Sequence, residues 1–373
     1  MDCGPERAAL LLAGSYEQIL FGFQLKAQSW DAEADFTHHA HTASLTAVAV
    51  NNRYVATGSK DETIQLYDMT KKVDHGSLLH HDGTITCLEF HGNKHLLSGG
   101  EDGLLCVWGT KKWECLKSIR AHKGHVSSLS VHPSGKLALS VGTDKTLRTW
   151  NLIDGKSAFI KNIKQNAQIV QWSPSGESYI VVLGKQLDIY SLTTASVSGV
   201  IQSQTRVSAL KFVTESVIAV AGDEEVVRLY DTNSQKCICE FKAHETRVKA
   251  LDSFQTPQSH VLATASSDGY IKLWKLDLEK LQNSPLLLGK VSTSARLTCL
   301  AVWLSNAGEE PKEESKQCEV AEKAVGNKLP GCKKKLVKCN PAEETEQTEQ
   351  TKQQTTQKRK KQSKETKKKK RKQ

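Results

Sequence analysis

The sequence has no run of about 18 consecutive apolar residues, which is the length that a membrane-spanning helix needs. Apolar residues make up only 38% of the 373-residue chain. One short apolar stretch, residues 8–13, follows Glu6 and Arg7 near the start. It is too short and too weakly flanked for a secretory signal peptide, and it fits a β-strand. We therefore expect no membrane-spanning segment and no membrane partner.

Motifs that hold phosphates, catalytic nucleophiles or metals are also missing. The chain has no Gly-rich phosphate loop, no G-x-S-x-G elbow and no H-E-x-x-H pair. Its ten cysteines are scattered without a C-x-x-C pair, and Cys237 and Cys239 stand only two apart, which is not zinc-ribbon spacing. We expect reduced structural thiols, no metal, no cofactor and no enzymatic activity.

The net charge of +10 is distributed unevenly. Residues 305–373 carry 20 Lys and Arg against 11 Glu, a net charge of +9, whereas residues 1–304 are close to neutral at +1. The segment 305–373 has no aromatic residue and cannot bury enough apolar surface to offset the entropy of ordering. We therefore expect a folded domain over residues 1–304 and a disordered Lys-rich tail over residues 305–373.

A short pattern recurs along the first 304 residues, in which an acidic residue at a tight turn stands six residues before an aromatic residue. Asp144 and Trp150, in SVGTDKTLRTWN, are one example. Turns of this kind fall at positions 61, 102, 144, 184, 224 and 268, so neighbouring copies are 40–44 residues apart. That period matches the length of one four-stranded propeller blade. Short apolar stretches such as 45–50, 54–59 and 63–67 predict its strands.

Two further positions recur in the four copies that have Asp at the turn: a His precedes the first strand, and a hydroxyl residue stands four residues before the Asp. With these positions the chain resembles the WD-repeat family. The resemblance implies that the four side chains hydrogen-bond in series and lock one blade, so we expect the recurring histidines to be structural. The predicted structural tetrads are His41, Thr57, Asp61 and Tyr67; His81, Ser98, Asp102 and Trp108; His122, Ser140, Asp144 and Trp150; and His244, Thr264, Asp268 and Trp274.

The tetrads are not equally complete. In the first copy, Tyr67 stands in place of Trp. The fourth copy has neither the His nor the acid and carries Gly184 at the turn. The fifth has Ser203 where His is expected and Glu224 in place of Asp. Because these two copies lack the hydrogen-bond network, we expect them to be the looser blades.

The two ends of the 304-residue segment complement each other. Residues 296–304 predict a first strand with no second strand after it, whereas residues 10–23 align with residues 54–67 so that Glu17 falls on Asp61. A further strand is expected near residues 34–38. We predict an all-β, seven-bladed propeller whose last blade combines one C-terminal and three N-terminal strands. We expect it to be monomeric, and deletion of either end should open the ring.

Eleven basic residues and one Glu occupy residues 358–373. Three interpretations of such a run are open. It is a nuclear or nucleolar import signal that also binds RNA phosphates, or it is only a solvated tail, or it binds anionic lipid. We favour the first interpretation, because no lipidation motif accompanies the run, and the lack of aromatic residues argues against base stacking. The residues assigned to the signal and to polyanion contact are Lys358, Arg359, Lys360, Lys361, Lys367, Lys368, Lys369, Lys370, Arg371 and Lys372.

Longer strings such as YEQILFGF, TGSKDETIQLYD and WECLKSIRAHKGHV resemble the p21-activated-kinase-interacting proteins, a family of nucleolar WD-repeat proteins. The likeness spans residues 15–304. It implies two roles, which are assembly of large ribosomal subunits in the nucleolus and inhibition of p21-activated kinase through the kinase's regulatory region. Its implied partners are that kinase, pre-ribosomal large-subunit particles and their assembly factors. The neutral body and basic tail favour the ribosomal role.

Two questions stay open at the level of sequence. A substrate adaptor of a ubiquitin ligase, or a general interaction scaffold, is an alternative function, although no F-box-like attachment segment is visible. The face that binds a partner is not indicated either. Residues 111–114 are one candidate, in which Trp113 either packs beneath a fourth strand or is an exposed anchor.

Overall fold

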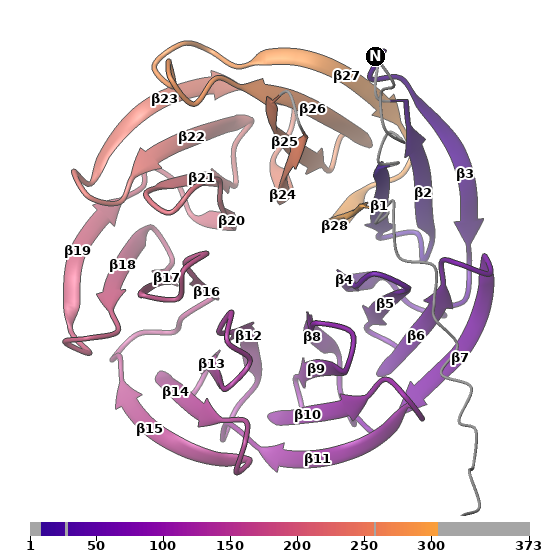
Figure 1. The fold of residues 1–373 in the computed structure, drawn as a ribbon, viewed down its shortest axis with the longest axis vertical. Coiled ribbons are helices and arrows are strands. Elements are labelled where there is room, and N and C mark those ends of the chain that lie inside the picture. Colours follow the sequence, from indigo (N-terminus) through magenta and orange to yellow (C-terminus); the bar gives the residue numbers. More distant parts are fainter. Residues whose placement is uncertain (1–8, 27–28, 257–258, 305–373) are drawn as a thin grey trace, which may run out of the picture. The chain divides into compact units, whose positions relative to one another are not determined.

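Seven four-stranded antiparallel sheets follow one another around a ring, and the described residues form no helix (Figure 1). The structure is a computed structural model that describes residues 9–26, 29–256 and 259–304. The prediction of an all-β seven-bladed propeller is confirmed. We number the blades 1 to 6 along the chain, and blade 7 is the one that closes the ring.

The strands of blades 1 to 3 are consecutive in sequence. Blade 1 contains β4 (Leu45–Val50), β5 (Tyr54–Ser59), β6 (Thr63–Asp68) and β7 (Val73–Leu79). Blade 2 contains β8 (Ile85–His91), β9 (His95–Gly100), β10 (Leu104–Gly109) and β11 (Glu114–Arg120). Blade 3 contains β12 (Val126–Val131), β13 (Leu137–Gly142), β14 (Thr146–Asn151) and β15 (Lys156–Asn162).

Blades 4 to 6 repeat this order, and blade 7 joins the two ends of the described chain. Blade 4 contains β16 (Ile169–Trp172), β17 (Ser178–Leu183), β18 (Gln186–Ser191) and β19 (Val197–Gln202). Blade 5 contains β20 (Val207–Phe212), β21 (Val217–Gly222), β22 (Val226–Asp231) and β23 (Lys236–Lys242). Blade 6 contains β24 (Val248–Thr256), β25 (Ser259–Ser266), β26 (Tyr270–Leu276) and β27 (Leu286–Ser292). Blade 7 contains β28 (Leu297–Leu304), β1 (Ala9–Ser15), β2 (Leu20–Leu25) and β3 (Ala32–His38).

Burial changes from the centre of the ring to its rim. In Figure 1 the first strand of each blade lies nearest the centre, and the fourth strand lies at the rim. The second strands, such as β5 and β21, are buried at nearly every position because both of their faces pack against neighbouring blades. Their sequences are accordingly apolar or small throughout rather than alternating. The rim strands β7 and β15 are mostly exposed and mix polar residues with exposed apolar ones such as Leu79 and Phe159.

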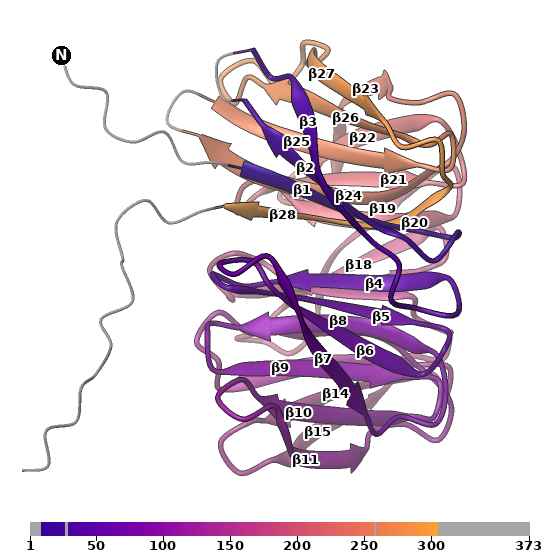
Figure 2. The same cartoon turned by 90° about the vertical axis from the view of Figure 1, so that its right-hand side faces the viewer.

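Two faces of the ring are distinguished by their loops. The turn face carries the tight turns between second and third strands, for example residues 143–145, and the linkers between blades. Antiparallel pairing places the turns between third and fourth strands, for example residues 152–155, on the opposite face, which we call the exit face. Leu304 at the end of β28 pairs with Ala9 at the start of β1, and both lie at the exit face (Figure 2).

Blade 7 confirms the predicted closure. Strand β28 pairs antiparallel with β1 from Ala9↔Leu304 to Ser15↔Leu297. At the turn face, Arg296 donates from its backbone N and its Nε to the two carboxylate oxygens of Glu17, each over 2.9 Å. Glu17 therefore occupies the turn position that Asp holds in other blades, as the alignment predicted. Residues from opposite ends of the sequence thus hold one blade together.

Hydroxyl side chains on the innermost strands add bonds between blades. Thr86 Oγ1 on β8 donates to the carbonyl of Val126 in blade 3 over 2.7 Å. Ser208 Oγ on β20 donates to the carbonyl of Val248 in blade 6 over 2.6 Å. Each bond joins a blade to the next around the channel, so the ring does not rely on apolar packing alone.

No helix in the described part of the chain is long and apolar enough to cross a membrane. The six described cysteines are free thiols: Cys87, Cys106, Cys115, Cys237, Cys239 and Cys299.

Candidate functional site

The structure brings the four predicted side chains of blade 3 into one hydrogen-bonded series. Trp150 Nε1 donates to Ser140 Oγ over 2.9 Å, and Ser140 Oγ lies 2.8 Å from His122 Nε2. His122 Nδ1 lies 2.9 Å from a carboxylate oxygen of Asp144. Every donor in this series has one acceptor when the neutral imidazole carries its proton on Nδ1. The order of residue types therefore follows from donor and acceptor chemistry.

The other three tetrads have the same geometry, apart from the aromatic residue of blade 1. In blades 2 and 6 the indole N–H of Trp108 and Trp274 donates to Ser98 and Thr264 over 2.9 and 3.1 Å. In blade 1, Tyr67 stacks on His38 instead, with ring centroids 4.3 Å apart. The remaining contacts are His41 with Thr57 and Asp61, both 2.9 Å; His81 with Ser98 and Asp102, 2.8 and 2.9 Å; and His244 with Thr264 and Asp268, 2.8 and 3.0 Å.

Burial and hydrogen bonding set the charge states in these networks. Burial opposes ionisation of Asp144, but hydrogen bonds from Thr146, His122 and the backbone N–H of Lys123 outweigh it and lower its pKa to about 2. Burial also lowers the pKa of His122 and of His244, although their Asp partners oppose that shift. The ionised carboxylate beside a neutral imidazole is therefore the folded state at neutral pH.

Each tetrad His uses both ring nitrogens within its own blade and is almost fully buried. A metal ligand or a general base needs a free nitrogen that a metal or substrate can approach. The tetrads therefore hold blades together, and a partner has to use other surfaces of the ring.

Blades 4 and 5 replace the tetrad with different contacts. In blade 5, Arg228 is buried and pairs with Glu224 and Glu240, while Thr205 Oγ1 donates to Glu224 over 2.8 Å. In blade 4, Tyr190 at the aromatic position stacks on Tyr179, with ring centroids 5.0 Å apart. The sequence pattern did not reveal the role of Arg228, because its partners come from three different segments of the blade. Only its spacing of four residues from Glu224 was a usable signal.

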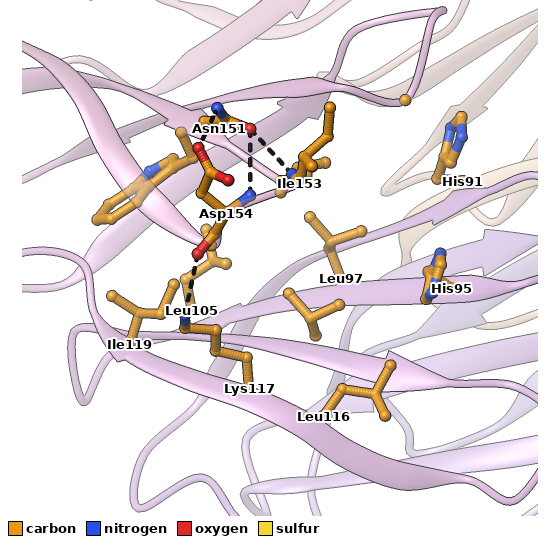
Figure 3. A pocket seen from close by; sticks show the side chains of 15 residues that line it. His91, His95, Leu97, Leu105, Leu116, Lys117, Ile119, Asn151, Ile153 and Asp154 are labelled. Atoms are coloured by element: carbon orange, nitrogen blue, oxygen red, sulfur yellow. Dashed lines mark hydrogen bonds between the residues drawn. The ribbon is translucent and has the colours of Figure 1, made fainter.

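An apolar groove opens on the exit face between blades 2 and 3 (Figure 3). Its volume is about 390 Å³. Leu97, Leu105 and Ile119 from blade 2 form its inner wall, and the turn at residues 151–155 of blade 3 lies opposite them. Leu116 and Ile153 stand at the groove with 51% and 72% of their surface exposed. Two large apolar side chains are thus presented to solvent beside an apolar hollow.

Hydrogen bonds fix the turn that presents Ile153. Asn151 Oδ1 accepts the backbone N–H of Ile153 over 2.9 Å, and Asn151 Nδ2 donates to Asp154 Oδ2 over 2.9 Å. Lys117 Nζ reaches across from blade 2 to the carbonyl of Asp154 over 3.4 Å (Figure 3). The groove therefore has a preformed rim. Sequence reasoning missed it, although an Ile inside the polar turn NLIDG was a visible signal.

Charged side chains collect in and above the central channel. Within it, Lys211 Nζ pairs with Asp252 Oδ1 over 2.7 Å, and burial raises the pKa of Glu89 to about 7. At the turn face, Arg206, Arg247 and Lys249 line a cavity of about 340 Å³. Burial and the two neighbouring guanidinium groups lower the pKa of Lys249. The three cations form a second, basic surface on the face opposite the groove.

Trp113 is half-buried and packs against aromatic side chains of blades 1 and 2. It lies in the turn between β10 and β11, and its ring meets Tyr54 of blade 1 edge-on with centroids 5.0 Å apart. It also contacts Phe90 and His75, at 6.5 and 6.1 Å between ring centroids. Of the two interpretations offered by the sequence, packing is the one that the structure favours. The predicted signal residues Lys358 to Lys372 lie outside the described residues.

Comparison with known proteins agrees with the geometry. The sequence profile of the WD domain, G-beta repeat, matches residues 33–68, 74–109, 113–151 and 235–275. Each matched segment starts near a rim strand and runs through three strands of the next blade, so a sequence repeat spans two blades. The four segments include the acid and the aromatic residue of the four tetrads, whereas blades 4, 5 and 7 lack the pattern that the profile detects.

Relatives match most of the chain. The p21-activated protein kinase-interacting protein 1-like of Gallus gallus is 62% identical over 88% of this chain and 89% of its own. The p21-activated protein kinase-interacting protein 1 of Homo sapiens is 55% identical over 86% of this chain and 85% of its own. The Shk1 kinase-binding protein 15 of Schizosaccharomyces pombe is 29% identical over 81% of this chain and 86% of its own. The chain therefore belongs to the family of WD-repeat p21-activated protein kinase-interacting proteins.

Proposed function

We propose that this protein is a non-enzymatic scaffold of the nucleus and nucleolus with two partners. One is p21-activated kinase, which it restrains by binding the kinase's regulatory region. The other is the precursor of the large ribosomal subunit, whose assembly it assists. The arrangement of the exit face carries this proposal, because the apolar groove opens there and the ring ends there at Leu304, before the Lys-rich segment.

The names of the relatives support the kinase partner, since three of them describe binding to or interaction with a kinase. The groove between blades 2 and 3 is the surface that we assign to it. An extended regulatory segment can place apolar side chains against Leu97, Leu105 and Ile119, with Leu116 and Ile153 closing over them. Neither rim residue has an evident role inside the ring, because both expose at least half of their surface.

The distribution of charge supports the ribosomal partner. Residues 1–304 are nearly neutral, whereas residues 358–373 carry a net charge of +10. A segment of this kind neutralises RNA phosphates without reading sequence, and its affinity falls steeply with salt. A ring that binds proteins, joined to a segment that binds RNA, suits an assembly factor. Nuclear and nucleolar residence follows from the same basic cluster.

Binding of the purified full-length chain to the kinase's regulatory segment tests the kinase proposal. The variants Leu116→Asp and Ile153→Asp place a charge at the groove and should each weaken binding at least tenfold, about 1.4 kcal/mol. Leu79→Asp is the matched control, because Leu79 is 72% exposed like Ile153 but lies on β7 away from the groove. The control variant should inhibit activation of the kinase as the native chain does, whereas the two groove variants should inhibit it much less.

The groove assignment is refuted if the two groove variants bind the kinase's regulatory segment as tightly as the Leu79→Asp control does. The absence of any binding by the native chain refutes the kinase partner itself. Replacing the ten assigned basic residues of the tail by Gln should leave kinase inhibition unchanged, because the tail serves the other partner.

A further inference from the structure

Blade 2 departs from the other blades at two corresponding positions. The residue before the tetrad His is His80 in blade 2, whereas it is Ala in the other three tetrad blades, at Ala40, Ala121 and Ala243. The residue two places before the aromatic is Cys106 in blade 2, and a polar or charged residue in the other repeats: Gln65, Arg148, Asp188, Arg228 and Lys272. One blade thus carries a metal-ligating residue type at both positions.

A third such residue lies beside these two. Cys115 on β11 stands opposite Trp108, the aromatic residue of the blade. The ligand atoms of His80, Cys106 and Cys115 all lie within 4.8 Å of one another. His80 comes from the linker between β7 and β8, Cys106 from β10, and Cys115 from β11, so three separate segments converge on one point. The spacing in sequence conceals this cluster, because His80 precedes Cys106 by 26 residues.

We propose that His80, Cys106 and Cys115 bind a zinc ion that clasps the linker between blades 1 and 2 against the outer strands of blade 2. Two sulfur ligands and one imidazole are the donor set that Zn²⁺ accepts in tetrahedral sites, and the cluster contains no carboxylate that would favour Ca²⁺ or Mg²⁺. Three protein ligands leave one position for solvent or for Ser118, whose Oγ lies 3.6 Å from Cys106 Sγ.

The burial of the three ligands suits a metal that arrives from solvent. His80 is exposed, Cys115 is half-buried and Cys106 is buried, so the ion enters from the rim and is held from inside. Zinc binds both thiols as thiolates, so binding releases their protons to solvent, and affinity should rise with pH.

Blade 5 provides an internal control. Cys237 of β23 pairs with Tyr230 of β22, just as Cys115 of β11 pairs with Trp108 of β10. In blade 5 the position of Cys106 is taken by Arg228, which is engaged with Glu224 and Glu240. Cys237 therefore lacks counterparts of His80 and Cys106, and it should not bind the ion.

Cobalt and zinc titration of the full-length chain tests the proposal. Cys3, Cys318, Cys332 and Cys339 lie outside the described residues and are first changed to Ser, so that they cannot contribute ligands. One equivalent of Co²⁺ should produce the absorption of a tetrahedral site with sulfur-to-cobalt charge transfer, and Zn²⁺ should abolish it. His80→Ala and Cys115→Ser should weaken binding by about 100-fold or more, above the effect of losing an outer-shell partner. Cys237→Ser should change nothing.

Three results would overturn the zinc site. One is an absence of tetrahedral cobalt absorption at one equivalent. Another is equal affinity in the His80→Ala and Cys237→Ser variants, both of which alter exposed residues and should keep the fold, as circular dichroism checks. The last is a disulfide between Cys106 and Cys115 in protein purified under reducing conditions, because a bonded pair cannot supply two thiolates.

Discussion

Replacing Asp144 by Ala should destabilise the propeller through the loss of a buried acceptor. The carboxylate accepts hydrogen bonds from His122 Nδ1, Thr146 Oγ1 and the backbone N–H of Lys123, over 2.9, 2.7 and 3.1 Å. The Asp144 side chain is only 10% exposed. Alanine leaves these donors in place without an acceptor, which is the costly way to remove a hydrogen bond.

The size of the effect follows from the pKa of Asp144. A pKa lowered from 3.8 to about 2 corresponds to about 2 kcal/mol of stability at neutral pH. An unpaired buried imidazole adds about 1 kcal/mol or more, so we expect a loss of about 3 kcal/mol. In large domains each kcal/mol of lost stability lowers the Tm by at least about 2 °C, so the Tm should fall by about 5 °C or more.

Thermal and urea unfolding of the native chain, Asp144→Ala and Asp82→Ala measure this effect. Asp82 is an exposed carboxylate at the turn face, so its loss should change the Tm little. Because the pKa of Asp144 is lowered on folding, its contribution is complete above about pH 4 and is lost as pH falls towards 2. The native chain and Asp144→Ala should therefore converge in acid. A Tm unchanged by Asp144→Ala at neutral pH would refute the argument for this tetrad.

Three further expectations follow from the same contacts. Burial lowers the pKa of His122 and His244, so the unfolded chain takes up protons first, and urea denaturation should show stability falling as pH drops below about 6.5. Arg296→Ala removes the side-chain bond to Glu17 across the closure, and it should speed hydrogen exchange in β1 and β28 more than in blade 3. Amides of blade 4 should exchange faster than those of blade 3, because blade 4 has no His–Asp pair; equal protection would contradict the locking role of the tetrads.

Repetition made most of this fold predictable. Four blades share the acid at the turn, an aromatic residue and a buried hydroxyl, so a period of about 40 residues was visible before any strand was placed. The closure was also accessible, because the unpaired strand at residues 296–304 required partners that only the N-terminal residues could supply. Glu17 showed the register, since its carboxylate, like that of Asp61, accepts a backbone N–H from the segment that precedes the first strand of its blade.

Features that depend on one blade rather than on the repeat were not predictable. The groove rim combines Leu116 of one blade with Ile153 of the next, and periodicity says nothing about which exposed residues meet across a boundary. Arg228 was missed for a related reason, because its partner Glu240 is identified only when the third and fourth strands pair. The convergence of His80, Cys106 and Cys115 likewise needs the register of blade 2 and the path of the preceding linker.

Affinity purification from nuclear extract tests the proposed scaffold most directly. The native chain is compared with a variant whose ten assigned tail residues are Gln, each with and without RNase, and captured proteins are identified by mass spectrometry. We predict that the native chain recovers large-subunit ribosomal proteins and assembly factors, that the tail variant or RNase weakens this recovery, and that kinase recovery is unaffected by either. Recovery of the kinase alone, with no ribosomal component under any condition, would contradict the account and leave a signalling inhibitor whose tail is only an import signal.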